Sequence, residues 1–434
     1  MKKNTRVRNV LAAGILTATV STPALAQSFY LQEQSTRGAG RSYSGETADT
    51  GVQSLWWNPA AIAGSGREIY LGAHGLLINS TVTDAGSTVT RPVPPAGLTT
   101  ATGGAARIED PVENGVLPNF ALALPVSDRL AIGVSVAAPY NFTNEYPAGS
   151  FTRYDALRSE LRTLDAQFTV AMKATDWLDL GVSVSAEYSD AELTTALPNL
   201  SPLLPDGASD LTGDGWDYGW AAGLQAHQGP WRFGVSYRSA IEHTLEGNVR
   251  ITGLLGPLAG ANVDGPGQAT FSTPWMASAS LRYALTPRWT LNAQINRLGW
   301  SEFDAIRIAY GSTTDAIVQD YKDITTGAIG VDYAWSPRLT LRAGAAFNPT
   351  PTRDGQRSAR TPDSDRTRYS VGATYDVTPG FSLDGAVTVV DFAGADIAFD
   401  RTLYSGTPVA TVSRLRGTAE GEGVGLALGA RWSF

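Results

Sequence analysis

Apolar side chains recur at every second residue in many short segments of this 434-residue chain, and this period constrains the fold most. Residues 424–434 show it clearly, because small or polar residues separate the apolar ones, which are Val424, Leu426, Leu428, Ala430, Trp432 and Phe434. A period of two places the two sets on opposite faces of a β-strand. The pattern returns in segments 130–137, 177–188, 231–237, 289–296, 339–347 and 381–389. The chain is therefore predicted to be all-β.

The apolar face of these strands must be covered either by a soluble core or by lipid. Bulky apolar residues repeat on one face of many strands with few charges among them, which favours lipid over a soluble all-β protein. Beyond the first 26 residues, no stretch reaches the ~18 apolar residues that a transmembrane helix needs. Among structures without such helices, a closed β-barrel is the one that satisfies its backbone inside a membrane. We therefore predict a transmembrane antiparallel β-barrel.

Connections between the predicted strands alternate between short and long. Short turns containing Pro, Asp or Gly lie at 125–129, 174–177, 227–231, 285–289, 335–338 and 377–381. Longer loops are predicted at 78–115, 141–160, 189–215, 242–270, 300–322, 348–366 and 391–420. These connections imply about fourteen strands, with short turns on the periplasmic side and long loops outside. Four tryptophans beside the short turns predict an aromatic girdle at the periplasmic interface: Trp177, Trp231, Trp289 and Trp335.

Residues 1–26 have the features of a secretory signal peptide. Basic residues precede the apolar segment 10–20, and Ala24-Leu25-Ala26 fits a cleavage site. The whole chain has a formal net charge of −8, and loss of this basic leader makes the remainder more acidic. That charge argues against a nucleic-acid partner. Because the chain has no cysteine, disulfides cannot stabilise it after export.

Residues 27–64 do not alternate and are rich in glycine. Their centre reads SLWWNPAAIAG, and irregular backbone of this kind cannot face lipid. It can lie inside a barrel, where polar side chains bond to it. We therefore predict a plug, or hatch, formed by residues 27–64 inside the lumen of a barrel formed by residues 65–434.

Several segments, taken in order, resemble the FadL-type outer-membrane transporters of long-chain fatty acids and other hydrophobic compounds. The segments are 35–60, 160–165, 213–220, 273–303, 321–323 and 362–366. The resemblance implies a fourteen-stranded barrel with an N-terminal hatch in the outer membrane of a Gram-negative bacterium. It also implies passive uptake of fatty acids or of apolar and aromatic hydrocarbons. Ligand would be captured at extracellular loops and released sideways into the membrane through a strand irregularity.

The resemblance also suggests residues for each step. Asn58, Pro59 and Ala60 match the hatch motif and would gate the channel, although a plain turn at the rim is the alternative. Two apolar loops would capture ligand, unless they only pack on each other, and their leucines are Leu197, Leu200, Leu203, Leu204, Leu254, Leu255 and Leu258.

Three further positions carry open alternatives. Pro139 marks either a kink in the third strand or that strand's extracellular end. Lys322 would bind a carboxylate headgroup, or is a rim charge paired with Asp323. Segment 362–366 suggests a charge-paired loop clamp. Acidic residues at 190–192, where the resemblance leads us to expect basic ones, leave uncharged hydrocarbons open as substrates.

Catalysis and cofactor binding find little support. The histidines His74, His227 and His243 lack metal-ligand spacing, and neither a G-x-S-x-G motif nor a P-loop is present. Only His243 is a conceivable member of a lipase site. No metal, cofactor or enzyme activity is therefore expected. The partners expected are a hydrophobic ligand or detergent and outer-membrane lipid, and the protein is expected to be a monomer. A general porin and a surface adhesin are the competing functions.

Overall fold

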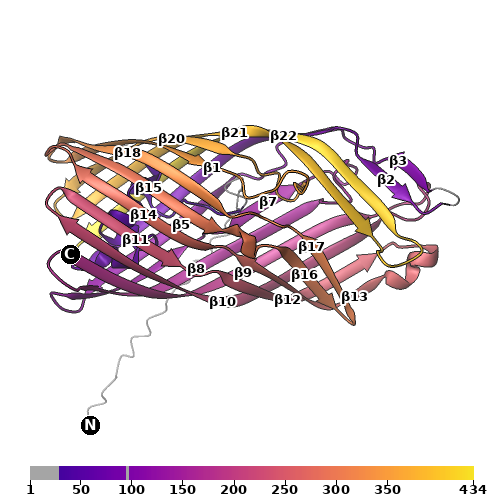
Figure 1. The fold of residues 1–434 in the computed structure, drawn as a ribbon, viewed down its shortest axis with the longest axis horizontal. Coiled ribbons are helices and arrows are strands. Elements are labelled where there is room, and N and C mark those ends of the chain that lie inside the picture. Colours follow the sequence, from indigo (N-terminus) through magenta and orange to yellow (C-terminus); the bar gives the residue numbers. More distant parts are fainter. Residues whose placement is uncertain (1–28, 94–96) are drawn as a thin grey trace, which may run out of the picture.

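The protein folds into one closed antiparallel β-barrel (Figure 1). A computed structural model describes residues 29–93 and 97–434, and the predicted signal peptide lies outside these residues. The first barrel strand, β1 (Glu68–Asp84), pairs with the last, β22 (Thr411–Ser433), along its whole length. Fourteen strands make up the wall, which confirms the prediction. In the described residues, no helix is long and apolar enough to cross a membrane.

Five of the wall strands consist of two segments each. These pairs are β6 (Leu130–Ala137) with β7 (Asn141–Glu145), β11 (Trp231–Arg238) with β12 (Ile241–Thr252), β13 (Val263–Thr273) with β14 (Trp275–Ala284), β15 (Trp289–Gly299) with β16 (Ala305–Tyr310), and β17 (Thr313–Val318) with β18 (Ile324–Ser336). The other wall strands are β1, β5 (Gly115–Pro125), β8 (Arg158–Lys173), β9 (Leu178–Leu197), β10 (Gly207–Gln228), β19 (Leu339–Asn348), β20 (Arg366–Thr378), β21 (Phe381–Leu403) and β22. The first outer loop adds the short strands β2 (Thr88–Arg91), β3 (Leu98–Ala101) and β4 (Arg107–Glu109).

The short turns lie where the sequence predicts them, but several outer loops are shorter than predicted. The predicted loops 189–215, 242–270, 300–322 and 391–420 are mostly strand, and the connections reduce to residues 198–206, 253–262, 311–312 and 404–410. The prediction was wrong there because these strands continue beyond the apolar band. Outside lipid, polar residues replace the apolar ones on the outer face, and the alternation that marks a strand disappears from the sequence.

Outward and inward faces of the wall differ as the alternation predicts. On β9, Val182 and Val184 are exposed to the outside, whereas Ser183 and Ser185 are buried in the lumen. The four predicted girdle tryptophans are all exposed beside short turns. A second set of exposed aromatic residues lies farther along the strands: Trp216, Tyr218, Trp220 and Tyr237. The part of β10 before Trp216 therefore projects beyond the apolar band.

Short helical turns fill the lumen at the end where the C-terminus lies (Figure 1). They are α1 (Thr36–Ala39), η1 (Glu46–Ala48), η2 (Val52–Ser54) and η3 (Pro59–Ile62). Nearly every residue from 29 to 62 is buried. We call residues 35–64 the hatch body and residues 29–34 the N-terminal arm.

Wall glycines allow the hatch body to lie directly against the strands. A Cβ atom on any of several of these glycines would overlap a hatch atom, and we call this set the glycine belt: Gly181, Gly223, Gly234, Gly330, Gly344 and Gly372. At Gly223 the overlap would be with the Asn58 side chain, and at Gly344 with the Arg41 backbone. The belt fixes the hatch body at a close and specific distance from the wall.

Candidate functional site

Asn58 connects the hatch body to the wall. Its Oδ1 accepts a hydrogen bond from the Ala60 backbone N–H (2.9 Å) and so caps η3, in which Pro59 occupies the first turn. This is the usual position for both residue types. The Asn58 Nδ2 group donates to the Thr47 carbonyl (2.7 Å) and to the Leu224 carbonyl on β10 (3.0 Å). The predicted gating residues Asn58, Pro59 and Ala60 therefore lie where the hatch meets the wall.

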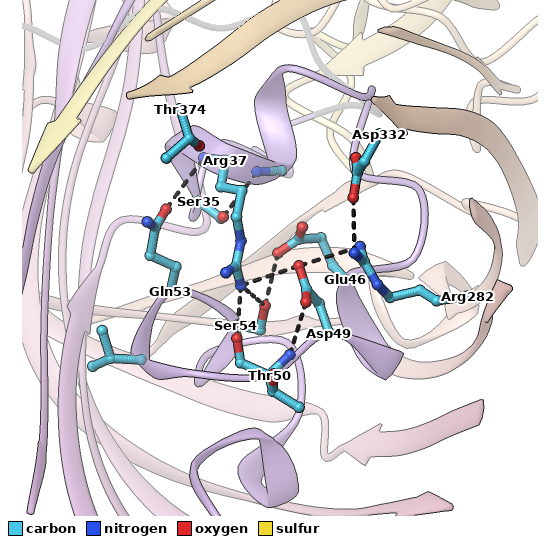
Figure 2. Close-up of polar contacts among 12 residues, drawn as sticks. Ser35, Arg37, Glu46, Asp49, Thr50, Gln53, Ser54, Arg282, Asp332 and Thr374 are labelled. Carbon is cyan, nitrogen blue, oxygen red and sulfur yellow. Dashed lines mark hydrogen bonds and ion pairs between the residues drawn. The ribbon is translucent and has the colours of Figure 1, made fainter. Parts of the chain in front are cut away.

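A buried network of charges holds the other side of the hatch body (Figure 2). Arg41 pairs with Glu46, with Asp49 (2.6 Å) and with Asp332 of β18 (3.3 Å). Arg282 of β14 joins the same network, at 3.3 Å from Asp49 and 2.7 Å from Asp332. Asp49 and Asp332 each have more than one cationic partner, and Glu46 has Arg41, so the buried charges are compensated in the way that burial requires.

The charge of Asp49 is strongly favoured in this environment. Burial alone would raise the pKa of its carboxyl group, but Arg282, Arg37 and Arg41 together hold the pKa well below its usual range. Arg37 also donates to the Thr50 carbonyl (2.8 Å), as Figure 2 shows. Asp49 is thus ionised at neutral pH, and its ion pairs connect the hatch body to the wall.

The N-terminal arm covers a break in the third wall strand. Residues 138–140, including Pro139, separate β6 from β7, so Pro139 lies within the wall strand and not at its outer end. The Leu31 N–H donates to the Pro139 carbonyl (2.8 Å), and the Asn141 N–H donates to the Phe29 carbonyl (3.1 Å). In the described chain, β5 pairs with this strand only as far as Phe120 and Val136. The arm therefore lies against a local gap in the ladder between β5 and β7.

An apolar cavity lies on the other side of the arm. It has a volume of about 60 Å³, space for only a few water-sized groups. Its apolar lining is Phe29, Phe142, Leu161, Ala191, Leu193, Leu245, Ala269, Phe271, Phe303 and Ile306. Phe29 of the arm packs edge-on against Trp300 (4.8 Å between ring centroids) and Phe303 (5.0 Å). A long apolar ligand fits this space only if a lining element moves. Phe29 belongs to the N-terminal arm, which has no regular secondary structure and lies against the gap in the wall.

The outer end of the cavity is closed by the loop 349–365. This loop crosses the lumen, where the Ala359 N–H donates to Asp155 (2.7 Å) and Tyr146 donates to the Ala359 carbonyl (2.8 Å). Arg360 and Thr361 of the loop line the cavity. Arg360 is buried, and its Nε has no hydrogen-bond partner among the described residues. Glu160 also lines the cavity, but its carboxylate is paired with Arg158 and Arg162, which leaves Arg360 as the incompletely bonded charged group there.

Lys322, the headgroup residue suggested by the sequence, does not line this cavity. It is exposed between β17 and β18, beside a polar pit of about 530 Å³, while its neighbour Tyr321 points inward. The predicted alternative partner Asp323 instead pairs with Arg297 (3.4 Å). Arg360 was not predicted from the sequence, because a buried arginine in a long polar loop has no periodic signal.

The predicted capture leucines gather at the outer mouth but divide into two groups. Leu197, Leu254 and Leu258 are buried in one cluster with Leu403 of β21, with Leu200 packed against it. The others face outward, with exposed fractions of 93% for Leu203, 42% for Leu204 and 41% for Leu255. Leu254, Leu255 and Leu258 lie in or beside η4 (Gly256–Ala261). The mouth thus has a packed apolar base and an exposed apolar rim.

Titratable groups elsewhere in the lumen form enclosed clusters. His243 is fully buried, with Nδ1 at 3.1 Å from the Ser189 hydroxyl and Nε2 at 3.3 Å from that of Thr273. Both hydroxyl groups belong to wall strands, and His243 has no exposed surface that a substrate could reach. Within residues 29–93 and 97–434, no group of three or more acidic or histidine side chains could hold a metal ion.

Comparisons with known proteins agree with this architecture. Residues 17–434 match the family model described as outer membrane protein transport protein (OMPP1/FadL/TodX). A long-chain fatty acid transport protein of Escherichia coli O6:H1 is 27% identical over 414 residues, which cover 86% of this chain and 89% of that protein. Outer membrane protein P1 of Haemophilus influenzae is 26% identical, with 87% and 88% covered.

Solved structures show the same fold. A Pseudomonas aeruginosa FadL homologue has a TM-score of 0.81 at 21% identity, covering 94% of this chain and all of that one. The Ralstonia pickettii toluene transporter TbuX has a TM-score of 0.63 at 18% identity, covering 92% and 98%. Since the family model spans the hatch and every wall strand, this chain belongs to the FadL/TodX family of outer membrane transport proteins, and its barrel lies in the outer membrane of a Gram-negative bacterium.

Proposed function

We propose that this protein carries hydrophobic compounds passively across the outer membrane, without catalysis and as a monomer. The observation that supports this most is the position of the N-terminal arm. On one side Phe29 lines the apolar cavity, and on the other side the arm bonds to the break at Pro139. Movement of this one element would join an apolar binding space to a gap in the wall.

Transport would proceed in three steps. The exposed rim leucines Leu203, Leu204 and Leu255 capture ligand, and the cavity then binds it after the arm moves. Asn58, Pro59 and Ala60 keep the hatch body in place, so that ligand leaves through the break at Pro139 into the membrane. Lateral release is favourable because an apolar ligand gains free energy in lipid and not in water.

Two ligand classes agree with the names of the relatives and with the lining of the cavity. One relative is named a long-chain fatty acid transporter and one structural neighbour a toluene transporter. The apolar lining suits both classes, while Arg360 at the outer end favours ligands with an anionic head. We propose amphiphilic carboxylates as the preferred substrates, with Arg360 in the role that the sequence suggested for Lys322.

Substitutions at the rim separate capture from packing. We expect Leu203→Asp combined with Leu255→Asp to lower the uptake of a radiolabelled fatty acid by intact cells several-fold, because both side chains are exposed. The barrel should still assemble, as judged by heat-modifiable migration in gels. Leu254→Asp is the matched comparison, since it buries a charge in the mouth cluster and should also destabilise the loop.

The competing functions predict other results. A general porin would show large, steady ionic currents from the intact protein in planar bilayers. An adhesin would bind a macromolecular partner, and its deletion would leave the uptake of hydrophobic compounds unchanged. Either of these results, together with normal uptake by the rim double variant, would overturn the proposal.

A further inference from the structure

Two arginines beside the arm form an incompletely paired cationic cluster. Arg366 and Arg368 are buried and, being two residues apart on β20, both face the lumen. None of the three guanidinium nitrogens of Arg366 has a hydrogen-bond partner among the described residues, nor has the Nε of Arg368. Asn348 lies directly opposite Arg366 on β19, and its side-chain amide is also unpartnered there. Buried donors of this kind are costly unless a ligand satisfies them.

Within the part of the chain that the structure describes, the arm supplies the one carboxylate that forms a direct ion pair with this cluster. Glu33 Oε1 lies 2.6 Å from Nη1 of Arg368, and both side chains are buried. The second carboxylate oxygen, Oε2, has no hydrogen-bond partner among the described residues. Glu33 therefore makes a one-sided contact with Arg368 and leaves Arg366 without a hydrogen bond. A carboxylate or phosphate bound between both arginines could use more donors than Glu33 does.

The contact with Glu33 holds the whole arm. Glu33 is the only charged residue of the arm, and Leu31, two residues earlier, makes the hydrogen bond that covers the break at Pro139. The rest of the arm is held by backbone hydrogen bonds, by apolar packing and by the Asn119–Gln34 contact (3.1 Å). Loss of the Glu33–Arg368 pair would remove the strongest electrostatic contact between the arm and the wall.

We propose that Arg366, Arg368 and Asn348 form an anion-binding site in which Glu33 substitutes for the carboxylate of a ligand. A ligand carboxylate that displaces Glu33 releases the arm and opens the path from the cavity to the break. An uncharged ligand of equal length binds at the exposed rim leucines but does not displace Glu33, so the arm stays in place and the cavity stays small. This inference rests on the proposed transport function and adds to it a reason why an anionic head group would start release.

Arm release can be measured directly because the chain has no cysteine. Gln32→Cys puts a single buried thiol on the arm, and Thr47→Cys puts one in the hatch body. The purified full-length protein is treated with a maleimide dye in the presence of dodecanoate, dodecanol or neither. Thermal shifts in the same samples report whether each compound binds.

We expect dodecanoate to speed the labelling of Gln32→Cys about tenfold, in line with the loss of one charged hydrogen bond. Dodecanol should bind without this effect, and labelling of Thr47→Cys should stay slow throughout. Adding Glu33→Gln should raise basal labelling of the arm and remove the response to dodecanoate. Adding Arg366→Gln should keep basal labelling low, because the Glu33–Arg368 pair remains, yet weaken the response.

Glu68→Gln is the matched control, because Glu68 binds the hatch body through the Val52 N–H (3.0 Å) and does not touch the arm. It should leave arm labelling unchanged. Equal labelling with dodecanoate and dodecanol, or a full response in Arg366→Gln, would overturn the inference while transport stands. If neither compound raises the midpoint of thermal unfolding, the proposed function fails as well.

Discussion

Asn58 shows how one side chain can determine the position of the hatch body. Its two polar atoms make three hydrogen bonds, one that caps η3 and two to backbone carbonyls of the hatch and of β10. The Asn-Pro pair was singled out from the sequence because it matches the hatch motif of the family that the chain resembles, and the capping role of both residues fits their local preferences. Glu33, Arg360 and Arg366 were not identified in these roles, because their contacts depend on residues far away in the chain.

Substitution of Asn58 should separate these two roles. Asn58→Asp keeps an acceptor for the Ala60 N–H but loses the donor to Thr47 and Leu224, whereas Asn58→Ala loses both. We expect Asn58→Ala to destabilise the hatch by about 1–3 kcal/mol, from the lost cap and the unsatisfied carbonyls. Hydrogen exchange of residues 44–63 measures this, and equal protection in all three proteins would contradict the assignment.

Gly223 tests the close approach of hatch and wall. A Cβ atom there would overlap the Asn58 side chain, so Gly223→Ala should cost about 1–3 kcal/mol. Gly327→Ala is the control, because a Cβ atom there would meet nothing within 4 Å. We expect the midpoint of thermal unfolding to fall for Gly223→Ala alone. Equal midpoints would show that the hatch can shift freely against the wall.

At the scale of elements, the strands were predictable and their interruptions were not. Alternation identified the membrane-spanning part of each strand in which it occurs, because the side chains that face lipid are apolar. The breaks between β6 and β7 and between β15 and β16 follow no such rule, and only the proline at 139 indicated one of them. The loop 349–365 has no period, so its position in the lumen was not predicted, and the arm was expected there only as part of the predicted plug 27–64, without its contact to the break at Pro139.

The hatch body as an element should respond to acid. Because the pKa of Asp49 is lower in the folded than in the unfolded protein, its charge stabilises the folded state above the unfolded value of about 3.9. That contribution decreases as the pH falls below about 3.9, and it is lost once the pH is also below the lowered pKa of Asp49 in the folded protein. Burial would raise the pKa of Glu33, but Arg368, His74 and Arg366 together lower it below its usual range, so the arm should loosen in the same pH range.

Hydrogen exchange of residues 29–64 between pH 7 and pH 3 measures this acid response. We expect Asp49→Asn to weaken the hatch at pH 7 and to flatten its pH dependence. Asp176→Asn, at a fully exposed turn, is the control and should change neither. A hatch equally protected at pH 7 and pH 3 would show that the charge network does not hold it.

As a whole molecule, the barrel is filled by the hatch at one end, and the loop 349–365 crosses the lumen nearer the other. A chain lacking residues 29–64 should still form fourteen strands, because wall pairing does not depend on the hatch. Its lumen would then expose Arg282, Arg342 and Asp332 to water, and we expect ionic currents well above those of the intact protein in planar bilayers. Equal currents would mean that another element closes the channel.

The contacts of the hatch also imply an order of biogenesis. Helix α1 packs against β1, β20, β21 and β22, η1 against β11 and β14, and η3 against β6, β8, β9 and β10. The start of the hatch body therefore depends on the last strand of the chain, since partners far apart in sequence meet slowly. Until β22 pairs with β1, the wall against which α1 packs is incomplete. We consequently expect the hatch to complete its folding only after the sheet has closed around it.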